Sequence, residues 1–391
     1  GAQDIYLTGN PQITFFKVVY RRHTNFSMEA IEQTWAGNEG TTSAGSCTAT
    51  ISRNGDLVYR MYLEVDMPGF QYTKHNPMAQ AITEVELEIG GQKIDKQTGL
   101  WMHVWSCLTQ PNSSAFTGKS SDNNKGNGTL YQNTTGMGGF ARGGDHAQRY
   151  WVPLQFWFCR NPGLALPLIA LQYHEVKVKL EHNFKVVDDE ACTSNKLWCD
   201  YIYLDTDERR RFAQVSHEYL IEQIQETSVT AGAKSSDLNF NHPIKELVFV
   251  ESTPGANDAA VVNVSGAATD AQIGSGSTAT YQLKLNGHDR FAERDYRYFT
   301  RTQVWEHHTG PGGLACSTDP AAGGRLNDAI GVYSFALKPE EHQPSGTCNF
   351  SRIDNAQFVG GSDDCKADKV FAINYNVLRI MSGMGGLAYS N

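Results

Sequence analysis

The sequence predicts an all-β fold of the sandwich or jelly-roll type, and three observations lead to this prediction. Short runs of alternating apolar and polar residues recur along the chain, each bounded by turn residues. Helical patterns are few. Long polar segments rich in Gly, Asn, Ser and Thr lie between the runs, as is typical of strand-dominated domains with loops at their ends.

The overall composition excludes several classes of protein. The chain has 391 residues, of which 40% are hydrophobic and 37 are glycine, so it is not a disordered chain, a coiled coil or a collagen. Its 33 Lys and Arg against 42 Asp and Glu leave a net charge of −9, which argues against nucleic-acid binding over the whole surface. No apolar run approaches the roughly 20 residues of a membrane helix.

Four clear strand patterns occur in the first half of the chain, at 48–52, 57–65, 85–89 and 176–181. Asn54-Gly55 separates the first two patterns and predicts a β-hairpin between them. Gly90-Gly91 predicts a turn directly after the third pattern. In the fourth, alternation places Val176, Val178 and Leu180 on the side of the core.

The second half adds strand patterns at 245–250, 281–285 and 370–378. Two aromatic-rich segments, 99–107 and 294–305, predict short helices. Three long polar segments cover 110–148, 253–280 and 307–327. Loops of this length are usually functional or disordered. Because loops gather at the ends of a sandwich, we expect these three to form one exposed face.

The chain contains signs of an internal duplication. Five short segments find a similar segment later in the chain, in the same order and at separations between 174 and 196 residues. The pairs are 31–33 with 221–223, 63–69 with 248–255, 87–91 with 283–287, 156–158 with 333–335, and 200–204 with 374–378. So long a period indicates two similar domains rather than a solenoid, with a charged connector near 205–216.

Motifs of the common hydrolases, nucleotide-binding proteins and metalloproteases are absent from the sequence. Glu84, Glu86 and Glu88 share one face of a predicted strand, which fits either a glycosidase-like carboxylate row or, as we favour, a solvated face or subunit contact. His307 and His308 are adjacent, so they would point to opposite faces of a strand and make a poor metal pair.

Several charged clusters are better explained by solvated loops or connectors. The segments 188–190 and 363–364 are acidic and could bind a cation, but both lie in turn-like polar surroundings. The arginine clusters at 21–22 and 209–211 could hold nucleic acid. Acidic neighbours favour a salt-bridged connector or interface for the second cluster.

Cysteines and sequons complete the candidate sites. The eight cysteines form no C-x-x-C pair, and we expect mostly buried free thiols, although Cys192 and Cys199 are close enough to pair. Asn-x-Ser/Thr sequons also begin at Asn25, outside the long polar segments. The candidate glycosylation sites are Asn112, Asn127, Asn133, Asn263 and Asn349.

Both ends of the chain resemble a known family. Residues 1–17 (GAQDIYLTGNPQITFFK) and 20–26 (YRRHTNF) resemble the opening of the major capsid proteins of nucleocytoplasmic large DNA viruses, especially those of algal and amoebal viruses. Residues 374–390 resemble the end of the same proteins. Segments 91–95 (GQKID) and 153–158 (PLQFWF) also match the pattern of the first domain.

The resemblance implies an all-β double jelly roll, with two consecutive eight-stranded antiparallel jelly rolls, a few short helices and long loops. It implies an N-terminal arm at 1–26, a first jelly roll at 27–205, a connector at 206–216 and a second jelly roll at 217–391. Three chains would form a homotrimer with a pseudo-hexagonal outline. Such capsomers would tile an icosahedral shell over an internal membrane.

The same resemblance implies a structural late protein of the virion, assembled in the host cytoplasm, with no catalytic activity, cofactor or bound metal. Its expected partners are other copies of itself, minor capsid proteins, and the internal viral membrane near the base of the capsomer. The outer loops would face the host and carry glycans. Direct contact with nucleic acid is not expected.

Two other functions remain open at this stage. A carbohydrate-binding or carbohydrate-hydrolysing jelly roll would expose aromatic side chains such as Trp101, Trp105 or Trp157 in a groove. A minor vertex protein would need only one jelly roll, so the duplication argues against it.

Overall fold

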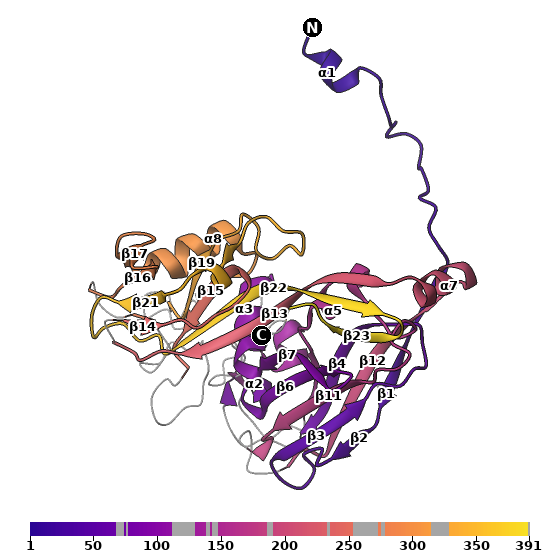
Figure 1. The fold of residues 1–391 in the computed structure, drawn as a ribbon, viewed down its shortest axis with the longest axis horizontal. Helices are drawn as coiled ribbons and strands as arrows, with labels where there is room; N and C mark the ends of the chain where they lie inside the picture. Colours follow the sequence, from indigo (N-terminus) through magenta and orange to yellow (C-terminus); the bar gives the residue numbers. More distant parts are fainter. Residues whose placement is uncertain are drawn as a thin grey trace, which may run out of the picture.

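A computed structural model shows two β-barrels side by side and an N-terminal arm that leaves the body (Figure 1). The structure describes residues 1–67, 74–75, 77–111, 130–137, 141–142, 148–185, 191–232, 235–252, 273–274, 278–313 and 328–389. Among these residues no helix has the length and apolar character needed to cross a bilayer.

The first barrel consists of two facing antiparallel sheets. One sheet has the order β1-β12-β4, with β9 and β10 both paired to β4. The other has the order β2-β3-β11-β6-β7. The strands are β1 (Phe26–Gln33), β2 (Trp35–Gly37), β3 (Gly45–Thr50), β4 (Leu57–Met67), β6 (Ile82–Ile89), β7 (Gln92–Thr98), β9 (Gln148–Pro153), β10 (Leu166–Pro167), β11 (Val176–His182) and β12 (Ser194–Leu204).

The second barrel repeats this arrangement. One sheet has the order β13-β22-β15-β19, and the other has the order β14-β21-β16-β17, with β18 also paired to β16. The strands are β13 (His217–Ser228), β14 (Ser236–Asp237), β15 (Pro243–Val250), β16 (Thr280–Leu285), β17 (His288–Asp289), β18 (Arg294–Asp295), β19 (Ile330–Ser334), β20 (Cys348–Asn349), β21 (Ala356–Gly360), β22 (Lys369–Met381) and β23 (Met384–Leu387).

Short helices and one small strand pair complete the described elements. The helices are α1 (Asp4–Thr8), α2 (Pro77–Ala81), α3 (Gly99–Thr109), α4 (Leu130–Thr135), α5 (Trp157–Arg160), η1 (Pro162–Leu164), α7 (Thr206–Gln214), the π-helix η2 (Tyr298–Thr302), α8 (Gln303–His307) and η4 (Phe350–Arg352). The strand pair is β5 (Lys74–His75) with β8 (Ala141–Arg142).

Matching strand orders account for the sequence duplication. The order β1-β12-β4-β9 in one sheet corresponds to β13-β22-β15-β19, and β3-β11-β6-β7 corresponds to β14-β21-β16-β17. Four of the five similar segment pairs begin in corresponding strands. In the fifth pair, 156–158 leads into α5, whereas 333–335 includes the end of β19. The corresponding strands thus form, in each half, the two four-stranded sheets of a jelly roll, and β2, β10, β18, β20 and β23 are additions to these sheets.

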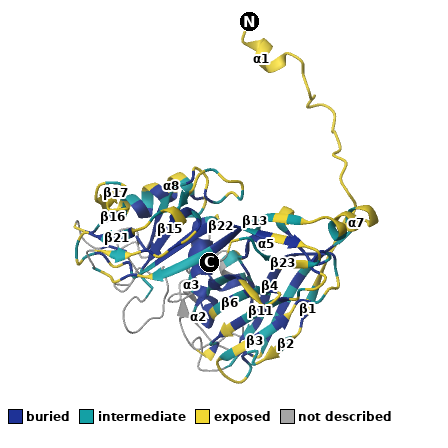
Figure 2. Ribbon diagram, in the orientation of Figure 1, coloured by how far each residue is buried: buried dark blue, intermediate teal, exposed yellow. Residues whose placement is uncertain are grey.

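Alternation along the strands builds a separate core in each barrel. Val176, Val178 and Leu180 are buried in the first core, as the pattern predicts. The second core includes Phe249, Tyr281 and Phe358, whose rings lie 4.9 to 5.1 Å apart. The centre of the molecule is buried and its rim is exposed (Figure 2).

The predicted hairpin at Asn54-Gly55 is wrong. Strand β3 pairs with β2 and β11 in one sheet, whereas β4 pairs with β12 in the other. The turn therefore carries the chain across the barrel between two strands that face the same core. Gly55 is needed there because a Cβ atom would lie 2.8 Å from the Tyr201 side chain. The turn at Gly90-Gly91, by contrast, joins β6 directly to β7.

Helices differ from the sequence prediction in two places. Residues 99–107 form α3 as predicted, but 294–305 begins with the short strand β18 and continues as η2 and α8. The connector contains the helix α7, whose first turn is capped by the Asp205 side chain. Its acidic first turn and Arg211 in the last turn both suit the helix dipole.

Most of the three long polar segments lies outside the described residues. Within the described part, 110–148 contains α4 instead of an uninterrupted loop. The described start of the third segment, 307–313, is also not part of an exposed loop face. The N–H groups of Gly310 and Gly312 bond to the carbonyls of Leu108 and Cys107, so this stretch packs on the end of α3.

Candidate assembly interface

Helix α3 joins the two barrels. The Thr98 hydroxyl accepts the N–H of Trp101 at 3.2 Å and caps the helix, as expected of a threonine at an N-terminus. A Cβ atom on Gly99 would lie 2.2 Å from the carbonyl oxygen of Ala79, so only glycine allows this close approach. The helix is apolar on nearly every side and is buried almost throughout.

One side of α3 packs on the outer face of the second barrel. The Trp101 and Phe371 rings lie 5.1 Å apart. The cluster combines α3 with β15, β19 and β22, whose members here are Val248, Val250, Ile330, Val332, Phe371 and Ile373. Along β22 the neighbouring residues Val370 and Ala372 point instead into the barrel core. This sheet is thus apolar on both faces, which explains the nearly continuous apolar runs of β15 and β22.

A buried ion cluster lies at the same junction. Glu222 accepts hydrogen bonds from Lys245 and from Arg160 of the first barrel, both at 2.7 Å. The Lys245 and Glu222 side chains are only 1% and 3% exposed. Burial alone would raise the pKa of Glu222, but Arg160, His342 and Lys245 outweigh it and lower the pKa to about 2. The carboxylate therefore stays charged and links the barrels.

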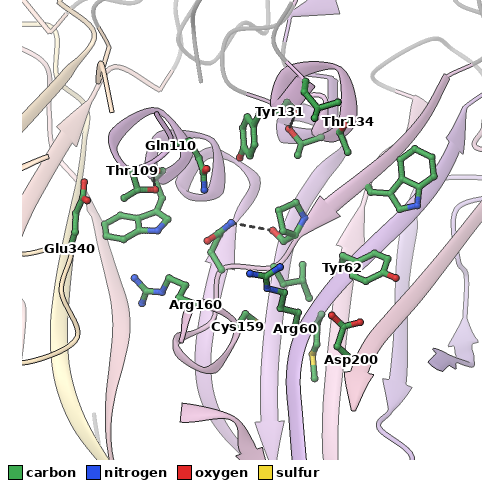
Figure 3. A pocket seen from close by; sticks show the side chains of 18 residues that line it. Arg60, Tyr62, Thr109, Gln110, Tyr131, Thr134, Cys159, Arg160, Asp200 and Glu340 are labelled. Carbon is green, nitrogen blue, oxygen red and sulfur yellow. Dashed lines mark hydrogen bonds between the residues drawn. The ribbon is translucent and has the colours of Figure 1, made fainter. Parts of the chain in front are cut away.

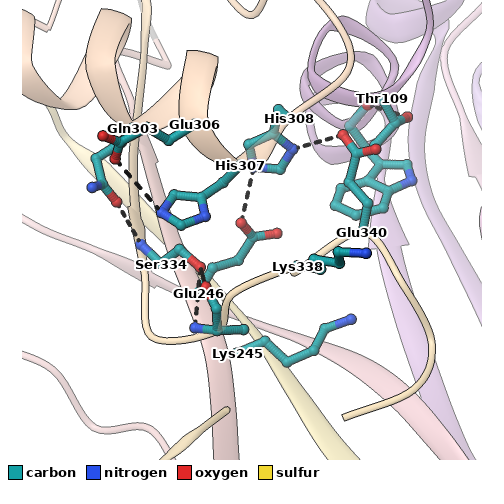
Figure 4. A network of polar contacts seen from close by, with 12 residues as sticks. Thr109, Lys245, Glu246, Gln303, Glu306, His307, His308, Ser334, Lys338 and Glu340 are labelled. Atoms are coloured by element: carbon teal, nitrogen blue, oxygen red, sulfur yellow. Dashed lines mark hydrogen bonds and ion pairs between the residues drawn. The ribbon is translucent and has the colours of Figure 1, made fainter. Parts of the chain in front are cut away.

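A second buried cluster surrounds His308 at the end of α8 (Figure 4). Its Nε2 lies 2.9 Å from Glu246, and its Nδ1 lies 2.9 Å from Glu340. Burial would lower the pKa of His308, but the two carboxylates outweigh it and raise the pKa to about 9. The ring is therefore protonated at neutral pH, and it also meets Trp105 of α3 edge-on at 6.4 Å.

Within the described residues, the outer face of the first barrel has no helix packed on it in the way that α3 packs on the second barrel. A pocket of about 820 Å³ lies on it beside the C-terminal end of α3 (Figure 3). Tyr62, Trp151 and Asp200 from β4, β9 and β12 line this pocket. Trp151 is 39% exposed. We call this surface, with Arg60 and Trp198, the open face.

Sequence reasoning missed both ion clusters. The signal for Lys245 and Glu246 was a pair of charges within the otherwise apolar run 243–250. A β-bulge between Ile244 and Glu246 turns these side chains into the junction. Arg160 and Glu222 carried no comparable signal, because they come from different barrels and meet only in the folded chain.

The three candidate tryptophans do not form the exposed groove that a carbohydrate-binding protein would present. Trp101, Trp105 and Trp157 are 2%, 3% and 2% exposed. The first two belong to the cluster between the barrels, and the third belongs to the core of the first barrel.

The glutamate row is paired with lysines rather than placed for acid–base chemistry. Lys96 lies 3.0 Å from Glu84, and Lys179 pairs with Glu86 and Glu88 across the sheet. In the described part of the chain no group of three or more His, Cys, Asp or Glu side chains is placed to hold a metal ion.

The remaining charged clusters also have defined places. Arg209 pairs with Asp56 at 2.9 Å, in agreement with a salt-bridged connector. The pair at 21–22 lies on the exposed arm. The acidic residues 188–190 fall outside the described residues, and the Asp364 carboxylate accepts the Thr278 hydroxyl.

Only one of the candidate glycosylation sites has a described side chain. Asn349 accepts the N–H of Ser351 at 3.1 Å and caps η4. Asn133 lies in α4, but its side chain is outside the described residues. Asn112, Asn127 and Asn263 also lie outside them.

The described cysteines are free thiols, and Cys316 lies outside the described residues. Cys192 does not pair with Cys199. Its sulfur lies 3.8 Å from the carbonyl oxygen of Glu39, whereas Cys199 is buried in β12 inside the first barrel. Burial raises the pKa of Cys47, Cys159 and Cys192 to about 12.

Comparison with known proteins agrees with this architecture. Residues 14–205 match the model of the major capsid protein N-terminus, and residues 208–386 match that of the large eukaryotic DNA virus major capsid protein. The major capsid protein of Pyramimonas orientalis virus is 50% identical over 417 residues, which cover 100% of this chain and 97% of that protein. The chain belongs to the major capsid protein family of large eukaryotic DNA viruses. Its members form the capsid of the virion.

Solved capsid structures support the fold of this major capsid protein. The chain in the quasi-atomic model of the PBCV-1 virus capsid is 34% identical, with a TM-score of 0.74, over 97% of this chain and 100% of that one. The Faustovirus major capsid protein, at 12% identity, has the same fold with a TM-score of 0.69 over 97% of this chain and 94% of that one. The predicted double jelly roll and the family resemblance are thus both confirmed.

Proposed function

We propose that this major capsid protein forms a homotrimer with a pseudo-hexagonal outline, and that such capsomers tile an icosahedral shell. The main support is the repeated barrel: three chains supply six barrels with the same strand order. A ring of similar units can close with quasi-equivalent contacts when each unit offers the same pair of complementary surfaces. The apolar contact of α3 with the second barrel is one such contact, already made within the chain.

The chain divides, in this proposal, into an arm at 1–26, jelly rolls at 27–205 and 217–391, and a connector at 206–216. The arm reaches minor capsid proteins or the internal membrane at the base of the capsomer. Its support is a row of exposed apolar side chains on a segment that leaves the body (Figure 1). The outer loops face the host and carry glycans, with Asn112, Asn127, Asn133, Asn263 and Asn349 as candidate sites.

The role is structural, and we infer no catalytic activity, cofactor or direct nucleic-acid contact. The lysine-paired glutamate row and the buried tryptophans support this part of the proposal. We also propose that the protein is expressed late in infection and is assembled in the host cytoplasm.

Light scattering of the purified chain tests the trimer. With 43.2 kDa per chain, a trimer has a mass of about 130 kDa before any glycan is added. A particle of that mass that persists on dilution supports the proposal. A monomer at every concentration, or a stable pentamer, would contradict it.

A further inference from the structure

We propose that the open face of the first barrel is the docking surface for helix α8 of a second copy of this chain. This contact between two chains would repeat the contact that α3 makes with the second barrel within one chain. This inference rests on the proposed trimer and names the surfaces that hold it together.

Helices α3 and α8 are counterparts in the two barrels. Helix α3 lies between β7 and β9, and α8 lies between β18 and β19, the corresponding place in the second barrel. Val104 and Trp105 recur as Val304 and Trp305, each 200 positions later. Both valines are buried. Trp105 is 3% exposed because it packs between the barrels, whereas Trp305 is 83% exposed. The second barrel thus covers Trp105, whereas Trp305 is left exposed to solvent in the single chain.

The open face is likewise the counterpart of the surface that α3 covers. The inward residues Val58 and Leu63 of β4 correspond to Ile244 and Phe249 of β15, each 186 positions later. The outward Tyr62 therefore corresponds to Val248, which packs against α3.

The register of the neighbouring strands extends the correspondence. Leu63 pairs with Leu197 and Val152, and Phe249 pairs with Val370 and Gly331. One residue after Leu197 and Val370, Trp198 corresponds to Phe371 on the outer side of the sheet. One residue before Val152 and Gly331, Trp151 corresponds to Ile330. Phe371 and Ile330 both lie in the cluster under α3. Apolar side chains in the covered face thus correspond to partly exposed aromatic side chains in the open face.

Aromatic residues around a pocket are the usual centre of a protein interface. The pocket of about 820 Å³ on the open face is lined by Tyr62 and Trp151, and by Thr109 at the end of α3. The indole N–H of Trp198 is buried without a hydrogen-bond partner in the described structure. Within the chain, Trp105 packs on the outer face of a sheet of the second barrel and meets His308 at the end of α8. For Trp305 of a second copy, the corresponding features are the open face and the end of α3.

Where the proposed contact differs from the contact of α3, the replacing residues on its two sides carry opposite charges. The helix position of Trp101 is taken by Arg301, 200 positions later. In the strand register, Asp200 follows Cys199 in the open face as Ile373 follows Ala372 in the covered face, so Asp200 takes the sheet position of Ile373. Trp101 lies beside Phe371, next to Ile373 on the same outer face. Arg301 bonds to Asp328 at 2.7 Å but remains 41% exposed, so it can also approach the carboxylate of Asp200 on a second copy.

The contact is head-to-tail, so each chain has one free α8 and one open face. Such heterologous contacts close into a ring when the rotation between units permits it. One contact geometry, used once within each chain and once between chains, then gives six barrels from three chains.

Trp305→Ala tests the contact in the full chain. Because the side chain is 83% exposed, we expect unchanged circular dichroism and an unchanged melting temperature for the isolated chain. We expect the dilution midpoint of the trimer to shift at least about 30-fold to higher concentration, as for an interface hot spot. Trp151→Ala on the open face should give a comparable shift. Tyr173→Ala is the matched control, because this aromatic side chain is 75% exposed and does not line the pocket of the open face, and it should leave the midpoint unchanged.

A pair of variants that each add one cysteine tests the geometry, and wild-type chain treated in the same way controls for the native thiols. Chains with Trp305→Cys are mixed with chains with Trp151→Cys and treated with a short bis-maleimide. The proposal requires a cross-link between the two kinds of chain that exceeds the cross-link within either kind alone. This inference would be overturned if the wild-type chain forms a trimer, both tryptophan variants have the wild-type dilution midpoint, and no mixed cross-link forms. That outcome would leave the proposed capsomer intact. A wild-type chain that never associates would overturn both.

Discussion

At the scale of single residues, the junction between the barrels depends on charges buried in an apolar setting. Glu222 is shared by a lysine of its own barrel and an arginine of the other, and its side chain is 3% exposed. Such a pair is not by itself strong evidence of net stabilisation, because both charges lose their hydration. The loss of one partner, however, leaves the other charge buried and uncompensated.

Glu222→Ala should therefore destabilise the chain by about 3–5 kcal/mol, as expected when one partner of a buried pair is removed. The measurement is the free energy of unfolding in urea. Glu341→Ala is the control, because Glu341 pairs with Lys338 on the surface, where the two side chains are 56% and 67% exposed. That change should remain within about 1 kcal/mol. Equal effects of the two variants would show that the buried cluster does not hold the junction.

The second residue-scale prediction concerns pH. His308 has a pKa of about 9 in the folded chain, against roughly 6.5 when unfolded. Since the folded pKa is the higher one, the stabilisation is complete below about pH 6.5 and is lost as the pH rises through 9. Its size is about 3 kcal/mol. His308→Gln should remove this part of the pH dependence, which the difference between the two unfolding curves from pH 6 to 10 measures. Parallel curves would contradict the assignment.

At the scale of elements, two adjacent glycines serve the same turn for different reasons. Gly90 and Gly91, between β6 and β7, both have positive φ, at 58° and 83°. A Cβ atom on Gly90 would also lie 2.2 Å from the His174 ring, whereas nothing lies within 4 Å of one on Gly91. The His174 ring in turn bonds to the backbone of Gly385 in β23, so this turn touches the end of the second half of the chain.

Gly91→Ala should consequently cost about 1 kcal/mol, the usual penalty for a side chain at positive φ. Gly90→Ala should cost more, because His174 must also move away from Gly385. Thermal unfolding of the two variants side by side checks this order. If Gly91→Ala were the more harmful change, the contact with His174 would not be what restricts the turn.

Sequence patterns predicted strands well but strand partners poorly. The runs 57–65, 85–89 and 176–181 all lie within observed strands. The Asn54-Gly55 signal predicted a hairpin because local turn chemistry is the same for a hairpin and for a crossing between two sheets. Which partner a strand takes depends on long-range hydrogen bonds, and a short segment does not encode them.

At the scale of the whole molecule, the arm is separate from the barrels. Residues 1–25 are all exposed, and the large apolar side chains Tyr6, Leu7, Phe15 and Phe16 are 91%, 87%, 89% and 99% exposed. Their hydrogen bonds are local to the arm. An arm packed under the first barrel would bury these side chains, which does not match this arrangement. Rows of exposed apolar side chains usually mark a surface that binds another protein or a membrane.

Deletion of residues 1–20 should leave the urea unfolding midpoint of the barrels unchanged, because these residues are all exposed and their described hydrogen bonds stay within the arm. The same deletion should impair the assembly of capsomers into larger particles, which electron microscopy of assembly reactions detects. A fall in the unfolding midpoint would show that the arm belongs to the fold. Normal particles from the truncated chain would show that the arm has no part in assembly.

The sequence by itself determined the all-β class, the duplication, most strand positions and the family, because alternation, turn residues and terminal motifs are local properties of the chain. It also indicated that no familiar catalytic motif is present. Tertiary structure alone decided which strands pair, that α3 lies between the barrels, and which charges meet there. Those features join residues such as Arg160 and Glu222, which are 62 positions apart and lie in different barrels. Only the folded chain brings such groups together, since burial and long-range contact depend on the whole arrangement of the sheets.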